Sequence, residues 1–557
     1  MDRPEAVSTG GDGPPADART IPGLLADRAR RYSSAVAISG PDGRMTYAEL
    51  HRAAIDVTRA AMAVGLRPGD RAAIWAPNSA RWIVTALGLL GAGAVLVPVG
   101  TRLRGPEAAE ILARTRCRAL FTVRGFLGID YLRMLDETGC ELRDLETCVL
   151  FSDSTGDSPT PVDGGRSPAV PRGTFLVSWS EFIENGCGTA LDDAEGRASS
   201  VAPEAISDIL FTSGTTGAPK GVLATHQQTL AVFHRWATVV TLRHGDRYLL
   251  VNPFSHTFGY KAGIIACLLR AATMVPVDRF DPRRFGHTIE RERITVLAGP
   301  PTLFGDLLES GQRWPTVRLA GTGGAAIPVS LVERMRRDLG IPQVFTAYGL
   351  TESVGVVAVC PPDAPAELVA TTVGKRLPDS EIRIVGPDGE PMPPGTPGEI
   401  VVRGPNVMHG YLDDPDATAD AIDAAGWLHT GDIGVLDGDG YLSITDRLKD
   451  MFIVGGFNAY PAEIERILLR HPDIRDAAVV GVPDPRLGEV GVAFLVPADP
   501  ARVDASAILD WARTRLAGYK VPRGVRFVDA LPRNTGGKVR KNELRSLLAD
   551  SERPADC

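Results

Sequence analysis

The sequence predicts an α/β protein. We expect a large N-terminal domain of stacked, mostly parallel βαβ sheets, a small β-barrel subdomain or distorted sheet, and a small α+β C-terminal domain. Three observations predict this fold class. Helix-like and strand-like segments alternate through the first part of the chain. From about Ser380 the pattern changes to short β segments with Pro-Asp-Gly turns. A last compact unit begins near Leu448, so the 557 residues form more than one domain.

The alternation of helices and strands is clearest in the first quarter of the chain. Glu49 follows Thr46 at capping-box spacing, which predicts an amphipathic helix over Thr46–Val64. The segments that follow predict the strand Arg71–Trp75, the helix Gly105–Arg114 and the strand Ala119–Val123. Because strands joined by helical crossovers run parallel, this rhythm predicts a parallel sheet covered by helices.

The uncharged segment Trp82–Gly100 approaches the roughly 20 apolar residues that cross a bilayer. Gly91 and Gly93 interrupt this segment. The interruption predicts a buried helix followed by a β-rich strand. We therefore expect no transmembrane span.

Two segments of the N-terminal part read as loops. Residues 1–20 lack apolar periodicity and predict a flexible tail, and residues 151–200, rich in Ser, Asp, Gly and Pro, predict a loop-rich surface excursion. After Val201 strand signals return, in residues 208–212, 247–254, 272–277, 294–299, 317–321 and 343–349. The last unit predicts helices at Pro461–Arg470 and Ala505–Leu516, strands at 477–484 and 490–497, and a terminal helix within 538–550.

Composition excludes several classes of function. The net charge of −8 without a basic block argues against a nucleic-acid partner. The seven scattered cysteines suggest neither a disulfide framework nor a zinc site, and the nine histidines lack HExxH spacing. The N-terminus has no apolar signal region, so we expect a cytoplasmic protein. Only 7 of the 60 basic residues are lysines, which makes the position of each lysine informative.

The run Asp208–His226 (DILFTSGTTGAPKGVLATH) carries the strongest functional signal. A strand opens into hydroxyl residues and glycines, whose backbone and side-chain donors suit phosphate oxygens, and Lys220 adds a positive charge. A Walker A loop requires Gly before the lysine, whereas Pro219 stands there and Gly221 follows. The run therefore predicts a phosphate loop of a different kind, in which Lys220 helps to hold the loop.

This run closely resembles the signature of the adenylate-forming superfamily, which includes acyl-CoA synthetases, nonribosomal adenylation domains and luciferases. The resemblance covers most of the chain, with further motifs in the family's order. These motifs are GTGGAAIP at Gly321–Pro328, YGLTE at Tyr348–Glu352, WLHTGD at Trp427–Asp432, DRLKDMFIVGGFNAYPAEIE at Asp446–Glu465, and PRNTGGK at Pro532–Lys538.

The resemblance implies a site for ATP and Mg²⁺. Tyr348 would stack on adenine, Thr351 would contact the α-phosphate and Glu352 would hold Mg²⁺, while Asp432 and Arg447 would bind the ribose. Because an acyl carboxylate and ATP are both anionic, adenylate formation needs cations and donors, and Lys538 is the implied catalytic lysine. We expect Lys538, Glu352, Thr351 and His256 to be catalytic. The implied nucleotide-binding set is Thr212, Ser213, Gly214, Thr215, Thr216, Lys220, Gly323, Gly324, Ala325, Tyr348, Gly349, Asp432 and Arg447.

The resemblance also implies an N-terminal AMP-binding domain at residues 21–446 and a mobile C-terminal lid at residues 447–557, with Lys449 as the hinge. Acyl-AMP would form with Lys538 inserted. The lid would then rotate about Lys449 and bring the loop Gly455, Gly456 and Phe457 beside CoA, whose thiol attacks the adenylate.

The run Asn252–Gly263 (NPFSHTFGYKAG) resembles the family's acyl-pocket motif and contributes His256, Tyr260 and Lys261. His256 either gates the acyl site or is a satisfied core histidine. Lys261 either binds a polar group of the substrate or pairs with a buried acid. The segment also resembles that of actinobacterial ligases for ring-bearing acids from sterol breakdown.

The resemblance predicts an ATP-dependent acyl-CoA ligase that activates a small-molecule carboxylic acid. The pocket motif lacks the aspartate expected to anchor an amino acid, and its apolar lining favours a hydrophobic acid, either fatty or polycyclic. The segments Gly481–Glu489 and Gly518–Arg523 resemble those of CoA ligases. The alternative is a stand-alone acyl-AMP ligase that loads a carrier protein, a branch that usually has an insertion near the hinge; none is evident here.

Overall fold

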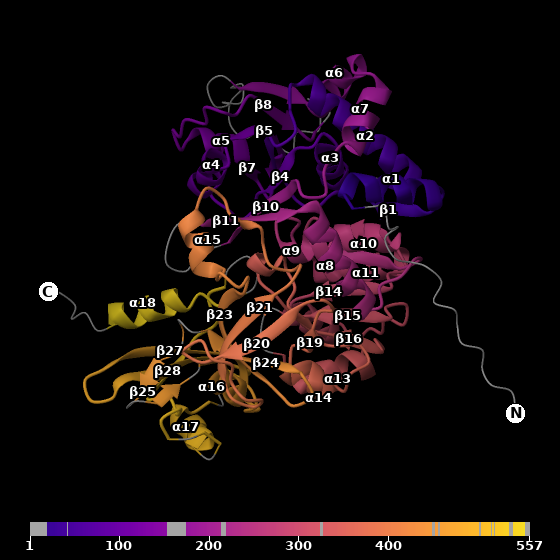
Figure 1. The fold of residues 1–557 in the computed structure, drawn as a ribbon. Coiled ribbons are helices and arrows are strands. Elements are labelled where there is room, and N and C mark those ends of the chain that lie inside the picture. The colour runs from indigo at the N-terminus through magenta and orange to yellow at the C-terminus, as the bar shows by residue number, and fades with distance from the viewer. Residues whose placement is uncertain are drawn as a thin grey trace, which may run out of the picture.

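Two large sheets with helices on their faces form the N-terminal part of the computed structural model (Figure 1). The structure describes residues 19–41, 43–152, 174–212, 219–323, 327–447, 450, 452–454, 457–459, 461–500, 503–513, 515–516, 518–533 and 538–551.

The eight-stranded sheet is parallel from β10 to β9, and β11 and β22 extend it antiparallel. The predicted strand Arg71–Trp75 is confirmed as β3, and the predicted strand at 119–123 lies in β5. The strand order of the eight-stranded sheet is β22 (Gly410–Tyr411), β11 (Lys220–Thr225), β10 (Ile206–Thr212), β4 (Val95–Pro98), β3 (Arg71–Trp75), β5 (Cys117–Thr122), β8 (Thr147–Leu150) and β9 (Phe175–Ser178).

The seven-stranded sheet is parallel except for the hairpin of β1 and β2. Its short buried strands are those that the apolar runs after Val201 predict. The strand order is β16 (Gln343–Phe345), β15 (Leu319–Thr322), β14 (Val296–Gly299), β12 (Arg247–Leu250), β13 (Thr273–Pro276), β1 (Val36–Gly40) and β2 (Gly43–Thr46).

The helix α2 begins where its capping box predicts. At the start of α2 (Tyr47–Ala63), the Glu49 backbone N–H donates to Thr46 Oγ1 at 3.3 Å and the Thr46 N–H donates to the Glu49 carboxylate at 2.7 Å. The segment Trp82–Gly100 forms part of α3 (Ala80–Gly91) and β4, as predicted. A Cβ on Gly88 would lie 2.4 Å from Val57 Cβ, so this glycine lets α2 and α3 pack closely. None of the helices in the described ranges is long and apolar enough to cross a membrane.

The remaining helices of the N-terminal part cover both sheets (Figure 1). They are α1 (Ile21–Arg31), α4 (Gly105–Arg114), α5 (Tyr131–Asp136), α8 (His226–Val239), α9 (Thr257–Gly259), the π-helix η2 (Tyr260–Ile265), α10 (Ala266–Arg270), α11 (Pro282–Arg291), α12 (Pro301–Glu309), α13 (Val329–Arg337) and α14 (Ala366–Thr371).

The prediction that residues 151–200 are a loop-rich excursion is wrong for their second half. Residues 174–200 form β9, α6 (Trp179–Asn185), η1 (Gly186–Gly188) and α7 (Leu191–Ser199). A second capping box, Ser178 with Glu181, begins α6, and Phe182 on α6 is fully buried. Turn-forming residues dominate the composition here, but one apolar strand and a capped helix are enough to extend the sheet.

The β-rich segment after Ser380 is an open antiparallel sheet. Of the two forms that the sequence predicts, the barrel is therefore wrong and the sheet is found. Its strands pair in the order β20 (Glu381–Val385), β21 (Gly398–Arg403), β23 (Leu428–Leu436) and β24 (Leu442–Arg447). A three-stranded sheet completes this layer, in the order β17 (Ala347–Tyr348), β18 (Ala358–Val359) and β19 (Lys375–Arg376). The two sheets share one apolar core and are joined at Leu442, whose C=O accepts the Val373 N–H at 2.7 Å.

The C-terminal elements gather at one end of the molecule, beside the strands of the small sheets (Figure 1). The sheet consists of β26 (Phe457–Ala459), β25 (Phe452–Val454), β28 (Gly488–Pro497), β27 (Ile474–Asp484) and β29 (Gly524–Phe527). The helices are α16 (Pro461–Leu468), α17 (Ala505–Arg513) and α18 (Lys541–Ser551), close to the predicted positions.

Candidate active site

The stem of the predicted phosphate loop lies at the carboxyl end of β10. In the antiparallel pair of β10 and β11, Thr212 faces Lys220, and Thr212 Oγ1 donates to the Lys220 C=O at 3.4 Å. The guanidinium of Arg114, on α4, donates to the C=O of Pro219. The two sides of the loop are therefore closed at its base, and Arg114 is a contact that the sequence reasoning missed.

The YGLTE motif forms a tight turn beside this stem. A Cβ on Gly349 would lie 2.1 Å from the Gly355 C=O, so the turn requires glycine here. Ser353 Oγ accepts the Leu350 N–H at 3.0 Å and donates to the Leu350 C=O at 2.9 Å, which closes the short helix η3 (Thr351–Ser353). Because η3 contacts both β10 and β23, the structure brings Thr351 and Glu352 between the phosphate-loop strand and the strand of Asp432.

Glu352 has a partner that the sequence analysis missed. The hydroxyl of Tyr411, on β22, donates to Glu352 Oε1 at 3.1 Å, and Lys220 Nζ lies 4.7 Å from the centre of the Tyr411 ring. Burial and the negative charge of Glu352 raise the pKa of Tyr411, so the phenol stays a donor. Tyr411 is distant from Glu352 in the sequence, and only the pairing of β22 with β11 brings them together.

Tyr348 and Asp432 meet although they belong to separate motifs. The Tyr348 hydroxyl donates to Asp432 Oδ2 at 2.5 Å, and both residues are buried. The Asp432 N–H donates to Thr430 Oγ1 at 3.1 Å. The register of β23 and β24 places Arg447 opposite Asp432. The predicted adenine and ribose residues thus share one neighbourhood.

The acyl-pocket motif is fixed by an asparagine that the sequence analysis did not single out. Asn78 Nδ2 donates to the C=O groups of Leu250 and Asn252 at 3.2 and 2.9 Å, and Asn78 Oδ1 accepts the Phe254 N–H at 3.0 Å. The only sequence signal is its place just beyond the strand Arg71–Trp75. A Cβ on Gly259 would lie 2.2 Å from the Pro253 C=O, so the loop can turn only at glycine.

His256 begins α9 and lies within electrostatic reach of Lys538. Its Nδ1 accepts the Phe258 N–H at 3.2 Å. His256 is exposed by surface area, but the surrounding protein partly desolvates its ring. Together with the charge of Lys538, this desolvation lowers the pKa of His256 to about 4. His256 is therefore neutral at pH 7, and Lys538, from the C-terminal part, lies on the acyl side of the site.

Lys261 pairs with a buried acid, which decides between its two interpretations. Its Nζ lies 2.8 Å from Asp208 Oδ1, and both side chains are 1% exposed. Ser207 Oγ donates to the other oxygen of Asp208 at 2.7 Å. The neighbouring Tyr260 is fully buried, and burial and Asp208 raise the pKa of its phenol. The pair connects the acyl-motif helix η2 to the strand that carries the phosphate loop.

Comparison with known proteins agrees with this constellation of motifs. A family model described as "AMP-binding enzyme" matches residues 25–412, and one described as "AMP-binding enzyme C-terminal domain" matches residues 463–538. The chain belongs to the AMP-binding enzyme family.

Relatives of this AMP-binding enzyme are CoA ligases. A 3-(7a-methyl-1,5-dioxo-octahydro-1H-inden-4-yl)propanoyl:CoA ligase of Mycobacterium tuberculosis is 47% identical, with 95% of this chain and 99% of the relative covered. A ligase of the same name from Rhodococcus jostii is 45% identical, with 94% and 98% covered. The solved o-succinylbenzoate CoA synthetase of Bacillus subtilis, in complex with its acyl-adenylate intermediate, is 30% identical, has a TM-score of 0.77, and is matched over 94% of this chain and 97% of its own.

The chain is thus an AMP-forming acyl-CoA synthetase, which uses ATP and CoA. CoA, rather than a carrier protein, is the acceptor that these relatives favour.

Several predicted residues of this AMP-binding enzyme lie outside the described residues. Of Arg447 and Phe457 only the backbone is described, at the end of β24 and the start of β26. Gly323 lies just after β15, near Thr346 and Ala347. The residues outside are Ser213, Gly214, Thr215, Thr216, Gly324, Ala325, Lys449, Gly455 and Gly456.

Proposed function

We propose that this acyl-CoA synthetase activates a compact, ring-bearing apolar propanoate. The observation that carries the proposal is the 47% identity, over 95% of the chain, to a ligase named for a bicyclic propanoyl-CoA. The apolar surroundings of the acyl motif support the same class, because Phe254 and Tyr260 are buried within it. A rigid apolar acid suits such a lining better than a polar one does.

In the proposed first half-reaction, the acid carboxylate attacks the α-phosphate of ATP and pyrophosphate leaves. Thr212 and Thr351 donate from either side of the phosphates, and Lys538 stabilises the charge that develops. A neutral His256 borders the acyl site without placing a second cation beside the carboxylate.

The residues present fit Mg²⁺ bound mainly by substrate phosphates. Within the described ranges, no group of three or more His, Cys, Asp or Glu side chains is placed to hold a metal ion. One carboxylate, oriented by Tyr411, matches the way Mg²⁺ is held by one or two carboxylates together with phosphates. When bound, Mg²⁺ supplies neutralisation of the phosphate charge. Glu352 would hold it, and Tyr411 would keep the carboxylate in position.

The adenosine end of ATP is assigned to the buried pair of Tyr348 and Asp432. The hydrogen bond of 2.5 Å between them fixes the carboxylate beside the tyrosine ring. A carboxylate accepts the hydroxyls of a ribose diol, and the ring offers a flat face to adenine. Arg447, opposite Asp432 in the sheet register, is assigned to the same ribose.

The proposed second half-reaction uses a different position of the C-terminal part. Residues 447–557 rotate about Lys449, which withdraws Lys538 and brings the loop Gly455, Gly456 and Phe457 to the adenylate. The CoA thiol then attacks the acyl carbonyl, and AMP leaves. The absence of a nucleic-acid partner and the cytoplasmic location remain predictions from the sequence.

A panel of carboxylic acids tests the proposed substrate. CoA-dependent AMP release is measured with 3-(7a-methyl-1,5-dioxo-octahydro-inden-4-yl)propanoate, decanoate, hexadecanoate and benzoate. We expect kcat/KM for the bicyclic propanoate to exceed the others by about tenfold or more, a difference of roughly 1.4 kcal/mol. An equal or higher kcat/KM for a linear fatty acid would overturn the substrate proposal and leave the ligase activity standing.

A further inference from the structure

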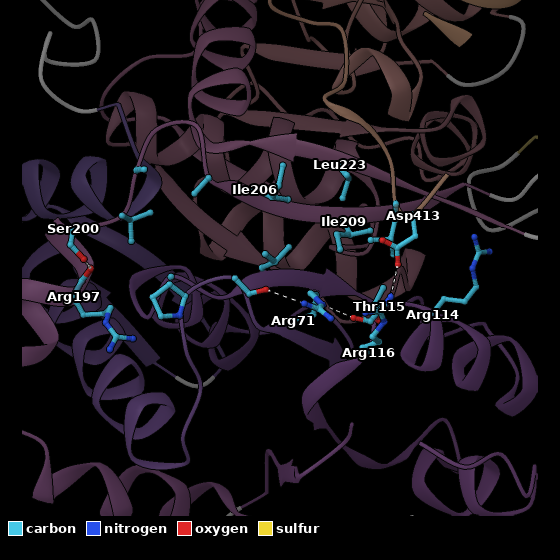
Figure 2. Close-up of a pocket in the computed structure, with 18 residues that line it drawn as sticks. Arg71, Arg114, Thr115, Arg116, Arg197, Ser200, Ile206, Ile209, Leu223 and Asp413 are labelled. Carbon is cyan, nitrogen blue, oxygen red and sulfur yellow. Dashed lines mark hydrogen bonds and ion pairs between the residues drawn. The ribbon is translucent and has the colours of Figure 1, made fainter. Parts of the chain in front are cut away.

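A cavity of about 560 Å³ (Figure 2) is lined by none of the predicted catalytic residues. Its lining includes Arg71, Val95 and Ile206, the first residues of β3, β4 and β10. Because these strands are parallel, their amino ends lie at the same edge of the sheet. The phosphate loop leaves the opposite, carboxyl end of β10 at Thr212.

Four arginines line this cavity, which we call the arginine pocket (Figure 2). Arg71 donates to the C=O groups of Thr115 and Gly69 at 2.6 and 3.3 Å, and Arg197 donates to the Ala92 C=O at 3.4 Å. In the part of the chain that the structure describes, neither guanidinium is paired with an acid. Carbonyl groups satisfy some N–H donors but leave the positive charge uncompensated.

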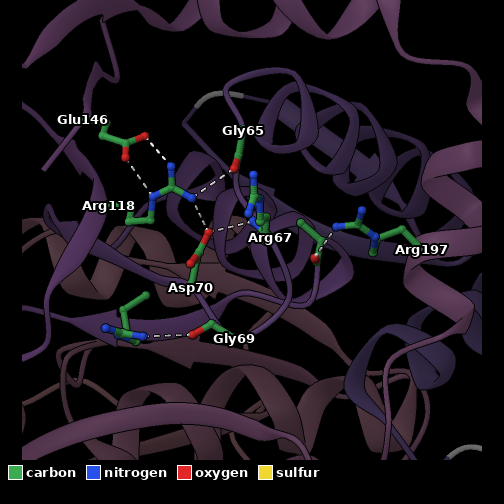
Figure 3. A network of polar contacts seen from close by, with 9 residues as sticks. Gly65, Arg67, Gly69, Asp70, Arg118, Glu146 and Arg197 are labelled. Carbon is green, nitrogen blue, oxygen red and sulfur yellow. Dashed lines mark hydrogen bonds and ion pairs between the residues drawn. The ribbon is translucent and has the colours of Figure 1, made fainter. Parts of the chain in front are cut away.

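Asp70, the acid next to Arg71 in the sequence, is hydrogen-bonded to other residues (Figure 3). Asp70 Oδ2 accepts from Arg118 at 2.7 Å and from the Arg67 N–H at 2.8 Å. Arg118 also forms a two-pronged contact with Glu146, at 3.1 and 2.5 Å. These carboxylates therefore neutralise Arg118 and do not neutralise Arg71.

The other two arginines leave the pocket positive. Arg116 pairs with Asp413 at 3.1 Å on the exposed rim, and Asp413 is the only acid among the described residues of the lining. Arg114 lies 3.7 Å from Glu110, one turn back on α4, and is about one-third exposed. The lining thus carries four guanidinium groups and a single carboxylate.

Apart from Thr115 and Ser200, the rest of the lining is apolar. Ile206 and Ile209 from β10, Leu223 from β11 and Leu412 form one wall, and Val95 adds to it. No aromatic ring that would stack on a nucleotide base occurs among the described residues that line the cavity. A ligand that fits must carry an anionic group and an apolar body, and the volume suits a small molecule.

We propose that the arginine pocket binds an amphipathic anion, an apolar chain or ring body that carries a carboxylate or phosphate, and that occupancy acts on ATP binding. The connection is Arg114, which lines the pocket and also donates to the C=O of Pro219 at the base of the phosphate loop. Two residues further along, on β11, the C=O of Gly221 accepts the N–H of Leu412, another lining residue, at 2.8 Å. A ligand anion that engages Arg114 competes with the Pro219 C=O. The inference depends on the family and not on the proposed substrate.

Binding is tested on the full chain by calorimetry, with the catalytic site saturated by a decanoyl sulfamoyl-adenosine so that both acyl and nucleotide positions are filled. Decanoate and decyl phosphate are the anionic probes, and decanol is the neutral one. We expect both anions to bind, and Arg71→Gln and Arg197→Gln each to weaken them about tenfold. Arg124→Gln, an exposed arginine outside the pocket, should leave binding unchanged. Ala202→Phe, which fills the exposed rim of the pocket without changing its charge, should also weaken binding.

Three outcomes overturn the site: no heat from either anion, equal binding in Arg71→Gln and Arg124→Gln, or equal binding of decanol. The variants are first compared with the wild type by thermal unfolding, and Ala202→Phe keeps the test decisive if an arginine variant does not fold. The link to ATP is tested separately. Decyl phosphate should raise the KM for ATP in the wild type but not in Arg71→Gln, and an unchanged KM in the wild type would overturn the link.

Discussion

Arginine and lysine occupy different kinds of position in this protein. Arginine supplies 53 of the 60 basic residues, and most of the arginine pairs described lie at the surface or half-buried. Lysine occupies a buried position where one compact charge is needed, as at Lys261 beside Asp208. A guanidinium has several donors in a fixed plane and would need more partners in the same space.

Replacing Lys261 by Met should destabilise the folded protein, because Asp208 would remain as a buried charge without its cation. We expect a loss of roughly 3–5 kcal/mol in the free energy of unfolding, measured by urea denaturation. Lys375→Met is the matched control, because Lys375 is exposed over the ring of Tyr441, and it should cost less than about 1 kcal/mol. Asp208→Asn combined with Lys261→Met should recover part of the loss. Equal effects of Lys261→Met and Lys375→Met would contradict a structural role for the pair.

Because His226 is buried in its neutral form, the free energy of unfolding should decrease at acidic pH. Burial lowers its pKa to about 4, and its Nδ1 accepts the Ile21 N–H at 3.3 Å, which requires the neutral ring. In the unfolded chain the pKa returns to about 6.5, so the unfolded state binds more protons between these values. The free energy of unfolding should therefore be unaffected by His226 above pH 6.5 and should decrease as the pH falls toward 4, by up to roughly 3 kcal/mol.

Urea denaturation of wild type and His226→Gln at pH 7.5, 6 and 5 checks this. The glutamine amide oxygen can accept the same N–H and does not titrate, so the variant should lose less stability across the range. The variant should still lose some stability at low pH, because the pKa values of His234 and His256 are also lowered to about 4. Parallel pH profiles would show that His226 is not responsible.

At the scale of elements, two turns that carry predicted catalytic residues depend on glycines that have no room for a side chain, Gly349 and Gly259. Gly349→Ala would push a methyl group against the Gly355 C=O, 2.1 Å away, and shift η3 with Thr351 and Glu352. We expect kcat/KM for adenylate formation, measured by pyrophosphate release, to fall roughly 10- to 100-fold. Gly438→Ala, in open space, is the control and should keep full activity. Normal kinetics of Gly349→Ala would mean that this turn does not position the catalytic groups.

Local signals predict elements well where capping and periodicity agree. The helix Gly105–Arg114 and the strand Arg71–Trp75 match the predicted bounds, because end signals and apolar spacing point to the same residues. The sheet edge at β9 was missed, since a strand of four residues leaves a weak pattern inside a turn-rich segment. The sequence left a barrel and a sheet as alternatives for the segment after Ser380, and the structure has an open sheet. Local patterns do not decide between the two, because closure of a barrel depends on long-range strand pairing.

At the scale of the whole molecule, the sequence motifs identify the candidate site residues, and the fold shows which other residues contact them. The run of motifs named Tyr348 and Asp432, and the structure adds that they are hydrogen-bonded to each other. Tyr411 and Asn78 could not be found from the sequence, because each acts through a residue far along the chain. Their spacing carries no motif. Only the pairing of strands and the packing of loops reveals them.

The proposed alternation of the C-terminal part between two positions predicts opposite defects in two variants. Lys538→Ala should reduce adenylate formation roughly 100-fold, since it removes the cation on the acyl side, and should spare thioester formation from synthetic acyl-AMP. Lys449→Pro should show the reverse, because it restricts the backbone rotation between the two states. Both half-reactions are measured separately for each variant. Equal losses in both half-reactions would exclude the division of labour between the two positions.

The ion pair of Lys261 and Asp208 restricts how substrate range can change in this enzyme. It joins η2, the helix of the predicted acyl-pocket motif, to β10, the strand that leads into the predicted phosphate loop. A substitution that reshapes the acyl side by moving η2 would also displace β10 and so weaken nucleotide handling. Successful changes of specificity, in laboratory evolution or between natural relatives, should therefore collect at side chains that leave η2 in place, or should replace both members of the pair together.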